Sequence, residues 1–295
     1  MTRAARQGVR CALVVFLLLA VALTSGVWQP AVARADTSEC PAHQAALEAI
    51  HAKIDEHNSR SRGSGPPEIV IPYNREAQQL EAEQARILDR LRACELAIDK
   101  VRAGGPPPKP LPPRILSALG GVAAVSRPGW TAPTAPVTLP DGRVTIPKGH
   151  PLRGVWDLLK TGESPMRPYP NVPLQGNARP NIGDKHPSGY TVGTRRSTGV
   201  PAVSPDHIVP KVEILYLPRF LELAPENMWE VINAPLNLQW LPSEVNETVK
   251  NFRSAAGMKG VDPIWQQQQI QLQDQKRREL TELIAQLADS QLPKS

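Results

Sequence analysis

The sequence predicts an α+β protein, and three features along the chain lead to that fold class. Residues 39–101 repeat apolar side chains at helical spacing on both sides of a break rich in glycine and proline. Residues 161–205 are rich in proline, glycine and asparagine, which predicts loops with short strands. A long amphipathic helix is predicted after Asp262. The expected order is therefore a helical hairpin, a proline-rich linker and a mixed C-terminal domain.

Residues 1–35 have the pattern of a secretory signal peptide. Three arginines precede an apolar run over residues 11–23, and Ala33-Arg34-Ala35 resembles a cleavage site. The run is shorter than the roughly 20 residues that favour a membrane span, although an uncleaved N-terminal anchor is the alternative. We therefore expect a secreted protein, extracellular or in the cell wall, that begins near Asp36. Residues 1–35 hold four arginines and no acidic residue, so the net charge falls from +6 to +2 without them. Net charge alone therefore does not indicate a nucleic-acid partner.

Residues 36–103 predict an antiparallel helical hairpin with one disulfide. Cys40 opens the first helix and Cys94 lies near the end of the second, and no other cysteine remains once the signal peptide is removed. Antiparallel helices place those two ends side by side, and exported proteins usually pair such cysteines. The hairpin has a net charge of −3, which excludes a phosphate-binding role. Two roles stay open, a docking or self-association module and a simple stalk.

Residues 104–150 predict a linker. The segment 104–113 contains six prolines and should be extended polyproline II, and proline-rich spacing returns over 128–147. A short helix is predicted over 115–125. A semi-rigid spacer is the expected use, with a motif for a proline-binding domain as the alternative.

Residues 151–295 predict the second domain. A short helix is expected over 152–159. Asp262 is a suitable N-cap for the long C-terminal helix, Pro263 suits its first position, and apolar residues form a stripe over 280–287.

One stretch carries side chains suited to phosphodiester hydrolysis. It comprises residues 204–210 (SPDHIVP) and, after a gap, residues 237–250 (NLQWLPSEVNETVK). A neutral histidine can deprotonate water near neutral pH, and an adjacent carboxylate can bind a hard cation. One asparagine oxygen can accept from the histidine N–H, and a second can complete an oxygen site for the cation. Neighbours on a strand point to opposite faces, so Asp206 and His207 can share a site only if the strand ends there, as Pro210 favours.

The strings Asp-His-Ile-Val-Pro, Asn-Leu-x-x-Leu and Asn-x-x-x-Lys resemble the HNH (ββα-metal) superfamily of nucleases, whose core is a β-hairpin followed by a helix. The resemblance covers residues 190–260. It implies a divalent metal, Mg²⁺ first and Mn²⁺ or Zn²⁺ as alternatives. The chain departs from the pattern in lacking the paired cysteines that often staple this fold, and an asparagine stands where many members have a final histidine. The implied roles are metal ligand for Asp206 and Asn246, general base for His207, positioning of that base for Asn237, and phosphate contact for Lys250.

The resemblance predicts a secreted, metal-dependent endonuclease, with DNA favoured over RNA. Arg195 and Arg196 precede the motif as candidate phosphate clamps, or as solvated loop charges. The arrangement of an export signal, N-terminal module, proline-rich spacer and nuclease resembles secreted polymorphic toxins of actinobacterial type. That resemblance adds a cognate inhibitor protein to the expected partners. The alternative is a non-catalytic protein of the cell envelope with a degenerate HNH core.

Overall fold

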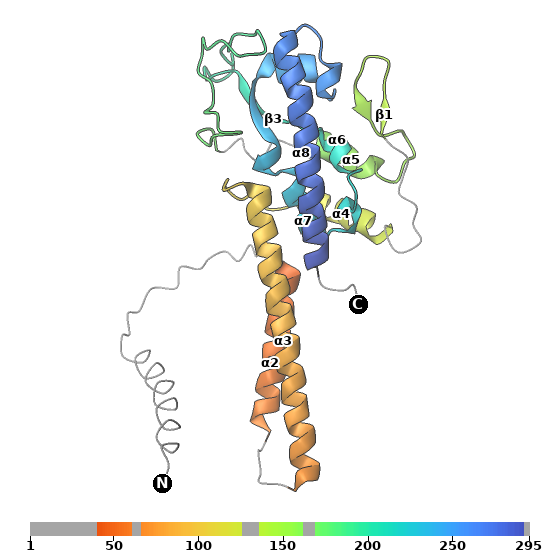
Figure 1. Cartoon of the computed structure of the whole chain (residues 1–295). Helices are drawn as coiled ribbons and strands as arrows, with labels where there is room; N and C mark the ends of the chain where they lie inside the picture. Colours follow the sequence, from red (N-terminus) through yellow and green to blue (C-terminus); the bar gives the residue numbers. More distant parts are fainter. Residues whose placement is uncertain (1–39, 61–65, 126–135, 162–168, 292–295) are drawn as a thin grey trace, which may run out of the picture. The chain divides into compact units, whose positions relative to one another are not determined.

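The computed structural model describes residues 40–60, 66–125, 136–161 and 169–291, and the predicted signal peptide lies outside them. The described residues belong to one compact unit. Figure 1 shows the order of its helices and strands. The helices are α2 (Pro41–Ser59), α3 (Pro67–Arg102), α4 (Pro113–Val125), α5 (Arg153–Thr161), α6 (Lys211–Ile214), α7 (Pro225–Ile232) and α8 (Pro263–Ser290), with the π-helix η3 (Val245–Lys250) and the 3-10 turns η1 (Phe220–Glu222), η2 (Pro235–Asn237) and η4 (Ala255–Gly257).

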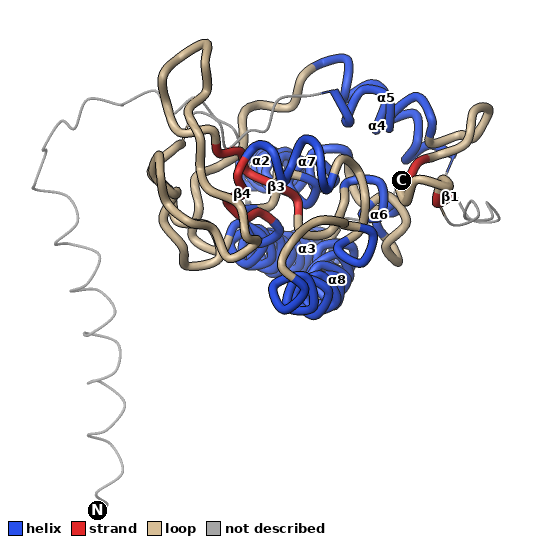
Figure 2. Tube along the Cα trace, turned by 90° about the horizontal axis from the view of Figure 1, so that it is seen from above, coloured by secondary structure: helices blue, strands red, loops and turns tan. Residues whose placement is uncertain are grey.

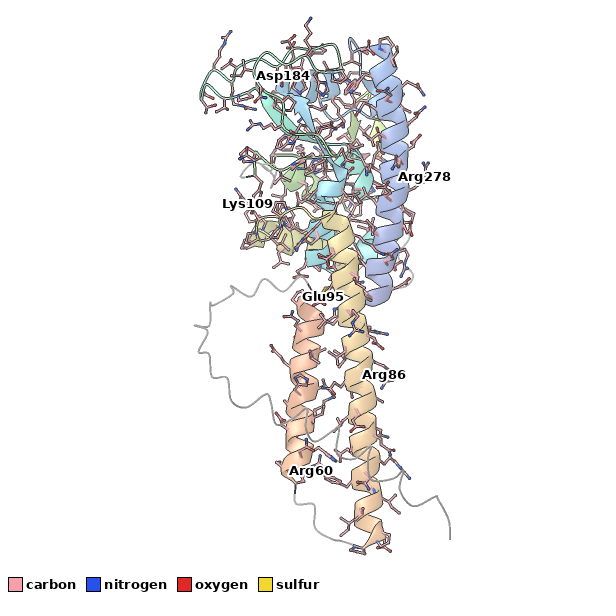
Figure 3. All side chains as sticks on the ribbon, turned by 60° about the vertical axis from the view of Figure 1, so that its left-hand side comes forward. Arg60, Arg86, Glu95, Lys109, Asp184 and Arg278 are labelled. Carbon is pink, nitrogen blue, oxygen red and sulfur yellow. A yellow bond between two sulfur atoms is a disulfide. The ribbon has the colours of Figure 1, made fainter. Side chains whose placement is uncertain are left out.

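The predicted helical hairpin is confirmed in α2 and α3. The disulfide between Cys40 and Cys94 joins the start of α2 to α3, with a Cα–Cα distance of 6.3 Å. Near the other end lies Arg60 (Figure 3). Its guanidinium donates to both carboxylate oxygens of Glu76. Beyond the disulfide, α3 continues and packs against α7, η2 and α8. The hairpin is therefore continuous with the rest of the compact unit and shares its core.

The main hydrophobic core joins the end of α3 to helices from the rest of the chain. Ile98 and Val101 of α3 are buried in it, as are Ile115 and Leu119 of α4. Helix α4 confirms the short helix expected over 115–125, but it lies inside the predicted linker. Its apolar face packs on α5 and α7, so this part of the segment belongs to the core and does not act as a spacer. The physical reason is the run of apolar residues between the two proline-rich stretches, because burying one face of a helix removes these side chains from water.

Helix α8 is the long C-terminal helix that the sequence predicts. Asp262 caps it, because its Oδ1 accepts from the backbone N–H of Trp265 at 2.8 Å, and Pro263 follows at the first helical position. The expected apolar stripe is buried in the core (Leu280, Leu283, Ile284 and Leu287). Helices α3 and α8 lie side by side in both views (Figure 1, Figure 2).

Two small antiparallel sheets complete the α+β fold of the described residues. Strand β1 (Val137–Thr138) pairs with β2 (Val144–Thr145), and β3 (Val203–His207) pairs with β4 (Leu238–Pro242). The loop segment 169–202 packs on the second sheet, where Leu174 and Val192 join a cluster with residues of β3 and β4. Over residues 169–202, the short strands expected among these loops are reduced to isolated bridges. Among the described residues, no helix combines the length and hydropathy that a membrane crossing needs.

Candidate functional site

The end of β3 brings Asp206 and His207 to one cavity. In the β3–β4 pairing, Asp206 lies opposite Gln239 and His207 lies opposite Leu238 at the last position of the strand. Both residues line a cavity of about 720 Å³, although strand neighbours normally point to opposite faces. They can do so because regular pairing stops at His207, three residues before Pro210. The strand therefore ends at His207, as expected if Asp206 and His207 are to share a site.

His207 is held as a neutral base. Its Nε2 lies 2.9 Å from the carbonyl oxygen of Ile232 at the end of α7. A carbonyl only accepts, so Nε2 carries the proton and Nδ1 is left as the basic nitrogen. Burial lowers the pKa of His207 well below its usual value, and the nearby ammonium charge of Lys211 lowers it further, against the hydrogen bond to Ile232. The imidazole is therefore neutral at pH 7, with its single proton on Nε2.

Asn237 acts on the backbone after His207 and not on the imidazole. Its side chain is fully buried; its Oδ1 accepts from the backbone N–H of Val209 at 2.8 Å, and its Nδ2 donates to the carbonyl of Val209 at 2.9 Å. The expectation that Asn237 bonds the histidine ring is therefore wrong. The carbonyl of Ile232 holds the ring, because the long connection from β3 to β4 places the end of α7 beside it. Asn237 fixes the chain two residues beyond His207.

Lys250 also differs from its predicted role. The lysine is buried at the end of η3, and its Nζ donates to Asp206 Oδ2 at 2.6 Å and to the carbonyl oxygen of His207. Gln239 donates to the same carboxylate oxygen at 3.1 Å. An ammonium that already has these partners is not free for the phosphate contact implied by the sequence. The physical reason is the π-helix, which ends in a left-handed residue, Asn251, and leaves Lys250 pointing inward over β3.

Two oxygen atoms remain as candidate metal ligands. Both bonds to the Asp206 carboxylate are made at Oδ2, so Oδ1 has no hydrogen-bond partner among the described residues. Asn246 donates from Nδ2 to the hydroxyl of Ser204 at 2.9 Å, which leaves its carbonyl oxygen available. Both residues line the cavity. Such a carboxylate and amide suit a hard cation that takes its other ligands from water and substrate phosphate. Within the described ranges, no cluster of three or more histidine, cysteine or acidic residues offers a denser metal site.

The cavity around these groups has an excess of positive charge. Arg195 lines it, donates to the hydroxyl of Ser243 at 3.0 Å and lies 3.7 Å from Glu247. Arg196 is exposed and is not among the described residues of the lining. Of the described residues that line the cavity, six are basic (Lys160, Arg179, Arg195, Lys211, Lys250 and Arg253) and two are acidic (Asp206 and Glu247).

Sequence reasoning missed several of these cations. Lys160, Arg179 and Arg253 come from α5 and from two separate loops, and nothing in their spacing links them to the motif. Lys211 had a detectable signal, because it directly follows Pro210 at the end of the Asp-His-Ile-Val-Pro string. The fold therefore assembles a basic lining that the linear motif does not contain.

No protein-family model matches the chain, and no curated protein or solved structure is significantly similar to it.

Proposed function

We propose that this protein is a divalent-metal-dependent nuclease of the HNH type, which hydrolyses phosphodiester bonds of nucleic acid in the cavity beside β3. The observation that carries the proposal is the state of His207. Its Nε2 is committed to the carbonyl of Ile232, its charge is suppressed, and it lines a cavity in which basic residues outnumber acidic ones. A neutral base in a cationic cavity suits attack of water on an anionic ester.

Groups of the chain itself carry out the proposed hydrolysis. Water in the cavity gives its proton to Nδ1 of His207, and the Ile232 carbonyl stabilises the imidazolium that forms. Asp206 and Asn246 would hold the cation through Oδ1 of each side chain. When bound, Mg²⁺ would neutralise charge on the phosphate and on the leaving oxygen. Lys250 keeps the Asp206 carboxylate oriented through its bond to Oδ2.

The biological setting proposed is extracellular. The leader pattern over residues 1–35 and the Cys40–Cys94 disulfide both suit an exported protein. We propose an extracellular nuclease or secreted toxin that acts on DNA in preference to RNA. An inhibitor protein would protect the producing cell by covering the cavity.

A second function is supported by the buried ion pair. The ammonium of Lys250 already pairs with the Asp206 carboxylate, which would otherwise be free to bind a metal cation. A chain in which this lysine permanently replaced the metal would be a non-catalytic binding protein of the cell envelope. This alternative predicts nucleic-acid binding or protein binding without turnover.

A nicking assay separates the two functions. Purified protein is incubated with supercoiled plasmid in Mg²⁺, Mn²⁺ or Zn²⁺, and the controls are EDTA and the variant His51→Ala, whose histidine is exposed on α2. We expect metal-dependent nicking that His207→Ala reduces by at least about 100-fold, within the usual contribution of a general base. Asp206→Ala and Asn246→Ala should impair turnover more than DNA binding.

The nuclease proposal fails if folded protein cuts neither DNA nor RNA with any of these metals. It also fails if His207→Ala keeps the activity of His51→Ala. Full activity in Asp206→Ala or Asn246→Ala would remove that residue from the metal site. A melting curve for each variant shows whether a loss of activity reflects loss of the fold.

A further inference from the structure

Two of the cavity's basic residues have no carboxylate partner among the described residues. The other four are accounted for by an ion pair or by the charge of a nearby carboxylate. Lys250 pairs with Asp206, Lys160 with Asp157 and Arg195 with Glu247. Arg253 donates to the backbone carbonyls of Asp141 and Val249, and after the hydrogen bonds and charge of Arg143 its own charge also lowers the pKa of the nearby Asp141 carboxyl. Lys211 and Arg179 are held only by backbone carbonyls and a ring. A desolvated cation without a counterion is unfavourable, so both positions favour an incoming anion.

Lys211 lies beside the proposed base. It begins α6, and its Nζ donates to the carbonyl of Leu159 at the end of α5 at 3.0 Å. An ammonium has three donors, so two remain for a ligand in the cavity. Burial lowers the pKa of Lys211 to about 8, and the ammonium in turn acts on His207. The side chain is therefore still mainly protonated at neutral pH and is poorly solvated.

Arg179 lies in the loop before β3. Its guanidinium stands over the ring of Trp240, 5.7 Å from the ring centroid, and donates to the carbonyl of Pro201 at 3.3 Å. Its Nε is buried without a hydrogen-bond partner. The ring and the carbonyl hold the guanidinium in place but supply no negative charge, and its planar donors suit a phosphate.

The two residues flank the Asp206–His207 pair along the chain path of β3. Arg179 contacts Pro201, which precedes the strand, and Lys211 follows the strand after Pro210. A five-residue strand spans roughly 13–17 Å, which is longer than a single phosphate group. Because the two residues are anchored beyond opposite ends of the strand, they suit two different phosphates of one nucleic-acid strand.

We propose that Lys211 and Arg179 bind two different phosphates of one nucleic-acid strand, on either side of the bond that is cleaved. This inference rests on the proposed function and deepens it, because it makes the substrate a polynucleotide strand and not a single nucleotide. The phosphates supply the counterions that both cations lack, and the strand is held along β3 with one ester beside His207.

The test is a binding measurement in EDTA, where no cleavage occurs. A labelled 12-nucleotide DNA strand is titrated with Lys211→Gln, Arg179→Gln and the double variant over a range of salt concentrations. The controls are Lys109→Gln and Arg86→Gln, which are exposed residues labelled in Figure 3. Each cavity variant should weaken binding by about 10-fold and lower the slope of log K against log salt by about 0.7, and the double variant by about twice that. Lys211→Arg and Arg179→Lys keep the charge and should restore the slope.

The inference is overturned if the cavity variants bind like the controls with the same salt slope. A change in only one of the two variants would overturn the two-phosphate arrangement. Plasmid nicking by the same preparations separates this failure from failure of the proposed function. Protein that nicks DNA while Lys211→Gln and Arg179→Gln bind normally is a nuclease without these contacts. Protein that never nicks, but loses binding in both variants, has the strand site without the catalysis.

Discussion

Replacing Asn237 by alanine should destabilise the protein more than the same replacement at an exposed asparagine. The side chain is fully buried and satisfies both backbone groups of Val209, which is itself buried. Alanine leaves one N–H and one carbonyl without a partner, and each such buried group costs roughly 1–3 kcal/mol. For the two groups together we expect the free energy of unfolding to fall by about 3 kcal/mol. For a compact unit of this size, that corresponds to a fall in Tm of roughly 6–12 °C.

The assay is thermal unfolding followed by circular dichroism, with Asn177→Ala as the matched control. Asn177 is exposed and donates one bond to the carbonyl of Gln175, so its loss should change stability by less than about 0.5 kcal/mol. The same Asn237 variant should lose the proposed nuclease activity, because the chain after His207 is no longer held. A Tm for Asn237→Ala within about 2 °C of the parent protein would refute the reasoning, since it would mean that Val209 has other partners or that water replaces the amide.

Three further outcomes are expected. Removing the disulfide with the paired changes Cys40→Ser and Cys94→Ser should lower stability by about 4 kcal/mol for its 54-residue separation, measured as a fall in Tm, and an unchanged Tm would contradict the entropic argument. The free energy of unfolding should fall below pH 6.5 by up to about 1.4 kcal/mol per pH unit from His207 alone, because its folded pKa is lowered and only the unfolded chain takes up the proton there. Denaturant unfolding at pH 5 and pH 7 should show a smaller difference in His207→Gln, and an equal difference would remove His207 as the cause. Asp262→Ala should lower stability by about 1 kcal/mol through loss of the cap on α8, and a chemical unfolding midpoint equal to that of the parent would show that the cap is dispensable.

Local patterns in the sequence predicted much of the fold. The apolar spacing of the two helices, the break between them and the two remaining cysteines were sufficient for the hairpin and its disulfide. The N-cap at Asp262 and the stripe over 280–287 were sufficient for α8. These features depend on neighbours within one or two turns of helix, so the order of residues already contains them. The packing of α4 into the core was not visible in the same way, because flanking prolines dominated the composition of its segment.

The candidate site was likewise predicted only in part. The string around Asp206 and His207 indicated which residues meet at the cavity, but not which atoms they bond. Asn237 was expected on the imidazole and lies on the backbone of Val209, and Lys250 was expected on phosphate and lies on Asp206. The basic lining from α5 and the loops had no signal in the motif.

By itself, the sequence determined the two hairpin helices and their disulfide, the short helices α4 and α5, α8 with its cap at Asp262, and the chemistry-bearing string at the end of β3. Only the tertiary structure decided the partner of each polar atom in the site. The physical reason is that a buried polar group takes whichever donor or acceptor the fold brings within reach. For His207 that group is a backbone carbonyl, at Ile232, and every residue type supplies the same carbonyl, so no pattern of side chains could reveal it.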